Sequence, residues 1–181
     1  NSAMPELREA IIEPGLPIID PHHHLWDRRM LVGALPNPLI HPFQNVLKRS
    51  PRYLLDEMLA DIDSGHNIVA TVFIECRAMY RTDGPDAMKP VGEVEFVNGV
   101  AAMSASGTFG PSRICAGIVG HADLMLGSKA GDVLDALTVA GNGRFRGIRH
   151  SVSHDPDSNV LGSLALRAPK LYMDRTFREG F

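Results

Sequence analysis

The sequence predicts an α/β fold in which parallel strands are joined by helices. Four apolar segments recur at intervals of about 35 to 50 residues, and segments with helical spacing of apolar residues lie between them. This alternation is typical of parallel strands connected by right-handed crossovers. Each apolar segment is also followed by ionisable residues. Because ligands bind at the carboxyl ends of parallel strands, this second pattern predicts a functional site at that edge.

The elements are predicted from apolar spacing and from breaker residues. The strands are expected at 16–20, 67–76, 113–120 and 145–152, the second of them (NIVATVFIEC) being apolar enough for burial on both faces. The helices are expected at 53–65, 91–106 and 129–140. The proline-rich segment 22–51 is expected to be a long irregular loop, packed through its aromatic residues. Near the C-terminus, Pro169 interrupts a weak helical pattern over 161–173, and another helix is expected after Asp174.

Composition limits the class of protein. A chain of 181 residues with net charge −3 can form one domain, and it lacks the basic surface that nucleic-acid or anionic-membrane binding requires. We find neither an apolar run of membrane-spanning length nor a secretory signal, and we therefore expect a cytoplasmic protein. Residues 1–3 precede Met4 and resemble a cloning scar, so the domain is expected to cover 4–181. Cys76 and Cys115 are expected to be buried free thiols.

The predicted strand ends carry an unusual concentration of histidine. Three of the four strands end with at least one, although the chain has only eight, and core packing alone does not produce that distribution. In chain order, the residues delivered to this edge are Asp20, His22, His23 and His24; Glu75, Cys76 and Arg77; His121 and Asp123; and Arg149, His150 and His154.

The stretch IIDPHHHLWD contains an HxH pattern directly after the first strand. In an extended chain residues i and i+2 point to the same side, so His22 and His24 can reach one metal ion while His23 points away. Neutral imidazole is a common ligand of zinc and similar ions. A catalytic site of this kind needs about three protein ligands and an open position, so this pair is only part of one.

The other strand ends leave alternatives open. His121 is placed to meet a substrate group or a metal, or else to cap the turn after its strand. Arg149 suits a substrate carboxylate, or an ion pair with a neighbouring loop. Glu75 and Arg77 share one side of the second strand, and either they pair at the rim or Glu75 points into the site. Trp26 either walls the pocket or packs in the core.

The stretch IIDPHHHLWD resembles the first-strand signature of the amidohydrolase superfamily. It is most similar to the amidohydrolase 2 branch, which includes sugar-lactone and pyrone-dicarboxylate lactonases and some metal-dependent decarboxylases. The stretches VFIECRAMYR, PVGEVEFVNG, IVGHADL and FRGIRHSV resemble that branch in the same order, so the resemblance covers residues 16–181.

The resemblance implies a (β/α)8 TIM barrel with His22 and His24 as its first two metal ligands. In that branch a later histidine and a final aspartate complete the site, and neither has a counterpart here. Because a typical barrel needs about 250 residues, we expect this chain to supply only the first four βα units of a longer protein, or of two paired copies.

The implied activity is metal-dependent hydrolysis of a small lactone or related carboxylated ester or amide by a metal-activated water. A decarboxylase on the same barrel and an inactive fragment are the alternatives. The cofactor would be zinc or manganese, although metal-free operation stays open, and the partner would be a small-molecule substrate; a homo-oligomer also stays open. We assign catalytic roles to His121, Arg149 and His150, substrate contacts to Arg149, Glu75, Arg77 and Trp26, and a supporting role beside the metal to Asp20.

Overall fold

The computed structural model describes residues 9–39, 41–161 and 167–181. The interpretation of residues 1–3 as a cloning scar therefore lies outside the described residues. The main sheet has four strands in the order β1-β4-β5-β6, and every neighbouring pair is parallel. The strands are β1 (Pro17–His23), β4 (Asn67–Ile74), β5 (Arg113–Gly120) and β6 (Phe145–Ile148). The predicted α/β class and parallel connectivity are confirmed.

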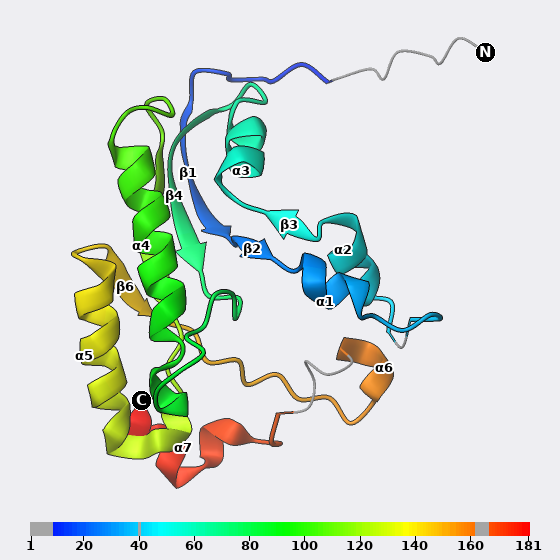
Figure 1. Ribbon diagram of the computed structural model, residues 1–181, viewed down its shortest axis with the longest axis vertical. Coiled ribbons are helices and arrows are strands. Elements are labelled where there is room, and N and C mark those ends of the chain that lie inside the picture. The colour runs from blue at the N-terminus through cyan, green and yellow to red at the C-terminus, as the bar shows by residue number, and fades with distance from the viewer. Residues whose placement is uncertain (1–8, 40, 162–166) are drawn as a thin grey trace.

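Three helices occur where the apolar spacing predicts them: α3 (Leu55–Ile62), α4 (Val91–Ala105) and α5 (Ala130–Gly141). Figure 1 shows α4 and α5 along one side of the sheet, and the two helices pack against each other. The core forms between this layer and the strands, where Phe73 and Ile118 are fully buried with Val94, Val97 and Leu137. This packing fixes the strands, and hence the positions of the residues that follow them.

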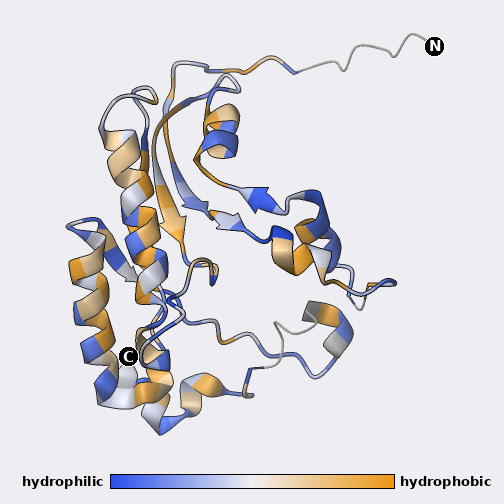
Figure 2. Cartoon of the chain, viewed as in Figure 1, coloured by the Kyte–Doolittle hydropathy of each residue, from blue (hydrophilic) through white to orange (hydrophobic). Residues whose placement is uncertain are grey.

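The sheet is open, and a closed barrel is not shown. Among the described residues, β1 and β6 form its two outer edges. The expectation that β4 is buried on both faces is wrong, because Val69 is 38% exposed. On β1, Ile19 is 60% exposed. β4 is apolar along much of its length (Figure 2), yet in the described part of the chain helices cover only one side of it.

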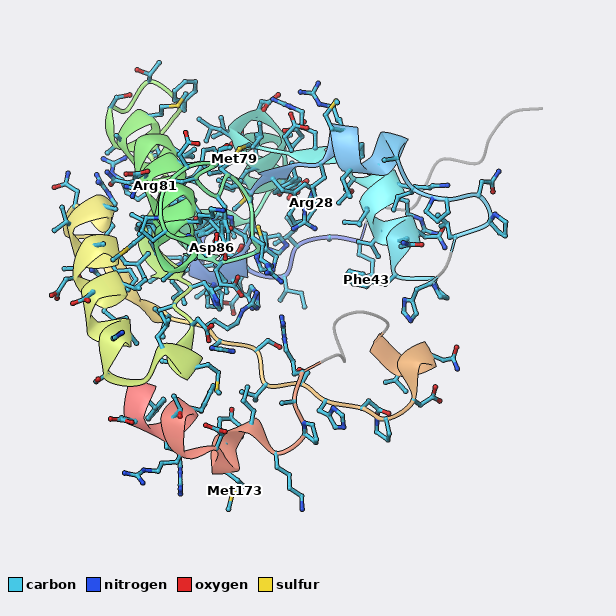
Figure 3. The ribbon with its side chains drawn as sticks, turned by 60° about the horizontal axis from the view of Figure 1, so that its bottom comes forward. Arg28, Phe43, Met79, Arg81, Asp86 and Met173 are labelled. Carbon is cyan, nitrogen blue, oxygen red and sulfur yellow. The ribbon has the colours of Figure 1, made fainter. Side chains whose placement is uncertain are left out.

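The segment 22–51 is more ordered than predicted. It contains β2 (Trp26–Asp27), α1 (Arg29–Gly33) and α2 (Gln44–Arg49), and β2 pairs antiparallel with β3 (Arg52–Tyr53). The expectation that its aromatic residues pack inward holds for Trp26, whose indole N–H donates to the Ser50 carbonyl at 2.8 Å. It fails for Phe43, which is 48% exposed on this outlying segment (Figure 3). Short elements of this kind carry little periodicity that a sequence could reveal.

The last part of the chain packs under the sheet's carboxyl edge. β6 ends at Ile148, four residues before the predicted end, and it is followed by α6 (Ser158–Leu161) and α7 (Arg175–Gly180). Part of the weak helical pattern, 162–166, lies outside the described residues. The helix expected after Asp174 is α7, and the Asp174 carboxylate caps it by accepting from the N–H of Phe177 at 3.0 Å. Phe177 is buried in a second small core. Within the described ranges, no helix has the length and apolarity needed to cross a membrane.

Candidate functional site

His22 and His24 lie on the same side at the end of β1, and their rings converge. Their Nε2 atoms are 3.3 Å apart, and the ring planes are nearly perpendicular at 89°. Two nitrogen ligands at 2.0–2.1 Å from a tetrahedral zinc ion are about 3.3 Å apart, so the spacing fits two adjacent ligands. In the absence of a cation, the same distance allows an N–H···N hydrogen bond between the rings.

A backbone carbonyl fixes the orientation of the His24 ring. His24 Nδ1 lies 2.7 Å from the carbonyl oxygen of Ile74, the last residue of β4. Because a carbonyl can only accept, Nδ1 carries the proton and Nε2 presents its lone pair in the neutral ring. Burial lowers the pKa of His24, which favours that neutral form. Metal-ligating histidines usually have such a carbonyl or carboxylate partner on the second nitrogen.

His23 points to the opposite side and is buried, as the i and i+2 spacing predicts. Its Nε2 lies 2.8 Å from the hydroxyl of Thr71, and its ring packs edge-on against Phe73. The same hydroxyl accepts from the N–H of Cys115, which has a left-handed backbone conformation at an irregularity of β5. Burial lowers the pKa of His23 to about 4, so this imidazole is neutral at physiological pH. His23 therefore supports the strands and does not face the converging pair.

The carboxylate of Asp20 supports the histidine pair through the backbone. It accepts from the N–H of His22 at 3.0 Å and makes no hydrogen bond to either ring. Among the described residues, no third histidine, cysteine or carboxylate joins His22 and His24 in a group able to hold a metal. Within the described ranges, the candidate ligands that the sequence predicts lie together as a pair, and the metal itself stays a prediction.

Glu75 and Arg149 form an ion pair between the ends of β4 and β6. Arg149 Nε donates to Glu75 Oε1 at 2.8 Å, and Nη2 donates to the Glu75 carbonyl at 2.6 Å. The Glu75 side chain is 9% exposed and that of Arg149 is 41% exposed. The alternative pair of Glu75 with Arg77 is therefore wrong. Arg77 has φ of 63°, which turns the chain after Glu75 so that Arg77 is exposed.

His121 and His150 form a second pair of rings near Arg149, with centroids 5.3 Å apart. His121 Nδ1 donates to the Arg149 carbonyl at 2.9 Å, so its Nε2 is free to accept in the neutral ring. His150 Nδ1 instead accepts from the N–H of Leu124 at 3.1 Å, so its neutral form carries the proton on Nε2. Burial, and then the nearby His121, lower the pKa of His150.

Trp26 lies at the edge of the first histidine pair. Its ring centroid is 6.1 Å from that of His24. The Arg28 guanidinium lies over the Trp26 ring, 5.2 Å from the ring centroid. It is half-buried and also packs against Tyr53. Trp26 therefore has features of both alternatives, because it packs against Tyr53 and also flanks the candidate ligand His24.

Glu93 is a functional candidate that the motif reading missed. It is fully buried on α4, and Oε1 accepts from the N–H groups of Cys76 at 3.0 Å and Ala78 at 2.7 Å. Burial raises the pKa of Glu93 to about 7. A signal was present, because Glu93 precedes Val97 and Val100 by four and seven residues and so continues the apolar stripe of α4. A carboxylate in such a stripe requires a partner.

The prediction of buried free thiols holds for Cys115 and only in part for Cys76. Cys76 and Cys115 are both free, Cys115 being buried and Cys76 half-buried. Burial raises the pKa of each thiol to about 12. Without a bound metal, both thiols are therefore protonated at physiological pH.

Comparison with curated proteins shows a similarity to a bacterial protein. The chain is 30% identical over 166 residues, or 91% of its length, to "Uncharacterized protein y4mH" of Sinorhizobium fredii (strain NBRC 101917 / NGR234). The match covers 48% of that protein, so the chain spans about half the length of the curated relative it matches. No family model and no solved structure matches the chain. The resemblance to the amidohydrolase 2 branch therefore stays a prediction.

Proposed function

We propose that this chain supplies the first two metal ligands of a metal-dependent hydrolase of the amidohydrolase type, acting on a small lactone or related carboxylated ester or amide. One observation carries the proposal: the Nε2 atoms of His22 and His24 converge to 3.3 Å, and the Ile74 carbonyl sets the tautomer of His24. The ends of β1 and β4 form this arrangement, and Arg149, which follows β6, pairs with Glu75 beside it. A bound divalent cation, zinc or manganese, would supply a Lewis acid that activates water and polarises the scissile carbonyl.

Arg149 is suited to orient a carboxylated substrate. Glu75 engages its Nε and the Glu75 carbonyl engages Nη2, so the guanidinium plane is fixed. The side chain is still 41% exposed, which leaves part of the guanidinium accessible. A fixed, partly exposed guanidinium can hold a carboxylate through paired hydrogen bonds. This would place the substrate near His24, whose pKa responds to the charges of Arg149 and Glu75.

The second histidine pair is suited to handle protons. In the neutral rings His121 offers an accepting Nε2 and His150 offers an N–H at Nε2, because their Nδ1 atoms are engaged in opposite senses. Ring opening of a lactone requires removal of a proton from water and delivery of one to the leaving alkoxide. A neighbouring acceptor and donor suit that chemistry, with a later aspartate of the longer protein as the expected principal base.

Two alternatives share these residues. A decarboxylase would use the same ligands, and the accessible guanidinium of Arg149 suits its carboxylate substrate equally well. Alternatively, the 181-residue chain is inactive by itself, since it provides only two candidate ligands among its described residues. The greater length of the curated relative supports a longer active protein, in which the open sheet would be completed into a barrel.

Zinc binding by paired double variants tests the proposal. His22→Ala/His24→Ala should lower zinc affinity more than about 100-fold, because it removes both ligands, whereas loss of an outer partner costs about 10- to 100-fold. His121→Ala/His150→Ala is the matched control, with two histidines removed from the same edge, and should cost less than about 10-fold. Isothermal titration with zinc measures both. Unchanged affinity in the first variant contradicts the proposal.

Product analysis on the longer protein then separates the reaction classes. Proton release from a panel of carboxylated lactones identifies hydrolysis, and release of carbon dioxide from the corresponding acids identifies decarboxylation. Absence of both, together with unimpaired zinc binding, would favour a binding protein that retains the metal ligands.

A further inference from the structure

Arg28 lies directly after β2, where the chain continues into α1 (Figure 3). Its Nη2 donates to the carbonyl of Cys76 at 2.6 Å, and its guanidinium lies over the ring of Trp26. The centroid of that ring is 6.1 Å from the centroid of His24. A carbonyl and an aromatic face therefore hold the guanidinium, because arginine combines planar hydrogen bonding with stacking on aromatic rings.

The end of β4 anchors Arg28 close to the candidate metal ligands. His24 Nδ1 donates to the Ile74 carbonyl at 2.7 Å, and Arg28 uses the carbonyl two residues further along the chain. Arg149 occupies the carbonyl between them, that of Glu75, at 2.6 Å. One short backbone segment thus holds a candidate ligand and two guanidinium groups.

The two guanidinium groups differ in the compensation of their charge. Arg149 Nε donates to the Glu75 carboxylate at 2.8 Å, so this pair carries no net charge. Within the described residues, no carboxylate forms an ion pair with Arg28. The carboxylate of the preceding Asp27 is engaged by Arg29, whose Nε donates to it at 2.9 Å. Arg28 therefore lacks a counterion in the part of the chain that the structure describes.

The remaining N–H groups of Arg28 are available to a ligand. Among the described residues, Nη2 has a hydrogen-bond partner, whereas Nε and Nη1 have none. Arg28 is half-buried, and neither Nε nor Nη1 is one of the enclosed, unpartnered side-chain atoms of the described residues, so both are open to solvent. A half-buried cation without a counterion favours an anion, and a guanidinium binds a carboxylate through paired N–H groups.

We propose that Arg28, held over the Trp26 ring, is a carboxylate-binding residue that offers an uncompensated guanidinium to an anionic group beside His24. Binding of a carboxylate is a property of the chain itself. Its assignment as the substrate carboxylate of the hydrolase rests on the proposed function. In that role Arg28 supplies the charge that attracts the carboxylate, whereas Arg149, whose charge is offset by its ion pair, orients it.

Trp26 provides the readout, because it is the single tryptophan of the chain and lies under the Arg28 guanidinium. Its indole N–H, which donates to the Ser50 carbonyl, gives one ¹H–¹⁵N signal that can be followed during titration with sodium acetate. The buffer is stripped of metal ions and held at about pH 8, where unperturbed histidine is neutral and does not attract the anion. Acetate should shift the signal saturably, whereas neutral acetamide, and sodium chloride at the same ionic strength, should not. Absence of a saturable shift with acetate overturns the inference.

Arg28→Gln should weaken acetate binding at least about 10-fold, because it removes a charge-assisted hydrogen bond. Arg49→Gln is the matched control, since it removes an equal charge from the exposed surface of α2, and should cost less than about 3-fold. Glu75→Gln/Arg149→Met removes a neutral pair from the same edge, and its loss should be smaller than that of Arg28→Gln. A folded Arg28→Gln protein with wild-type acetate affinity overturns the inference, and so does a larger loss in the double variant.

A measurement on the wild type covers the case in which Arg28→Gln does not fold. The guanidinium carbon of each arginine gives a ¹³Cζ signal, and the signal of Arg28 is identified by its disappearance in Arg28→Lys. During the acetate titration this signal should move with the same midpoint as the indole N–H of Trp26. Movement of the Arg149 ¹³Cζ signal in place of that of Arg28 would assign the carboxylate to Arg149 and contradict the proposal.

Zinc titration keeps the role of Arg28 separate from the proposed function. Arg28→Gln should change zinc affinity less than about 10-fold, because Arg28 is not a candidate ligand. If zinc affinity does not depend on His22 and His24, the proposed function fails, while the acetate titration still decides whether Arg28 binds a carboxylate. If zinc affinity depends on that pair but acetate affinity does not depend on Arg28, only the role of Arg28 fails.

Discussion

The two histidine pairs lie at the same edge of the sheet but present opposite chemistry. His22 and His24 bring their Nε2 atoms to 3.3 Å, and the Ile74 carbonyl leaves Nε2 of His24 unprotonated. His121 and His150 stack with centroids 5.3 Å apart, and their Nδ1 atoms are engaged in opposite senses. The spacing of the first pair suits the cation proposed above, whereas the second pair offers one hydrogen-bond donor and one acceptor. The partner of each Nδ1 atom, rather than the number of histidines, determines what each pair can do.

The residues that pack behind the two pairs differ as well, and the difference should appear in the pH dependence of stability. Buried His23 lies behind the first pair, whereas Phe177 packs against His150 in the second, with centroids 5.2 Å apart. The pKa of His23 is lowered from 6.5 to about 4, so the unfolded chain binds this proton more readily. The stability contribution is therefore fully present above pH 6.5 and is lost as the pH falls toward 4.

As the pH falls from 7 to 4, the unfolded chain takes up the His23 proton more readily than the folded protein does. At 1.36 kcal/mol per unit of pKa difference, this should lower the free energy of unfolding by up to about 3 kcal/mol. Glu93 contributes with the opposite sign, because its pKa is raised to about 7 and its contribution is lost as pH rises from 4.5 through 7. Urea unfolding of wild type and His23→Gln isolates the histidine, since only the wild type should lose this stability on acidification. Phe177→Leu is the control and should lower stability by a similar amount at each pH. Parallel pH profiles for wild type and His23→Gln would contradict the expectation.

Arg149 connects the two pairs, and its removal should show that they share one support. Its guanidinium holds Glu75 next to the carbonyl that orients His24, and its backbone oxygen orients His121. We expect Arg149→Met to lower the free energy of unfolding by about 1–3 kcal/mol, because the buried Glu75 carboxylate loses its partner. This is below the cost for a fully buried pair, since the Arg149 side chain is 41% exposed.

The reverse substitution provides the comparison. Glu75→Gln should cost less than about 1 kcal/mol, because the partly exposed guanidinium of Arg149 can be solvated when its partner is removed. Denaturant titrations of the two variants measure the asymmetry. Equal losses would mean that the pair contributes through contact rather than through compensation of the Glu75 charge.

Local patterns in the sequence were enough to predict the layers of this fold and one side of the site. β-branched runs and helical spacing located the strands and helices, and the two-residue period placed His22 and His24 together with His23 opposite. Contacts between distant segments were beyond that reasoning. Pairing of Glu75 with Arg149 instead of Arg77 depends on the left-handed turn at Arg77, which has no sequence signal comparable to glycine.

Glu93 shows the same limit of prediction from sequence, because its contacts are with the backbone. Its place in the apolar stripe of α4 marked it as buried, but its partners are backbone amides of Cys76 and Ala78, which any residue type provides. The tautomers of His24 and His121 likewise depend on carbonyls that only the register of the strands supplies. The residue types gathered at this edge could therefore be predicted, whereas their hydrogen-bond partners depend on the positions of main-chain atoms.

The smallest expected effect concerns the donor in the second pair. Asp123 Oδ1 lies 3.8 Å from His150 Nδ1, and its charge raises the pKa of His150 against the stronger lowering by burial and by His121. Asp123→Asn keeps an oxygen that can accept from the Met125 N–H but removes the charge, so the pKa of His150 should move further down. The change should be small and should disappear at high salt, because Asp123 is 52% exposed and its charge is screened. The titration midpoint of the His150 ring proton, measured by NMR, checks this, with Asp135→Asn on α5 as the control. A midpoint that rises, or that moves equally in the control, would contradict a specific effect of Asp123. The pKa of His150 would then follow the net charge of the protein, and the distinction between the two pairs would rest on hydrogen bonding alone.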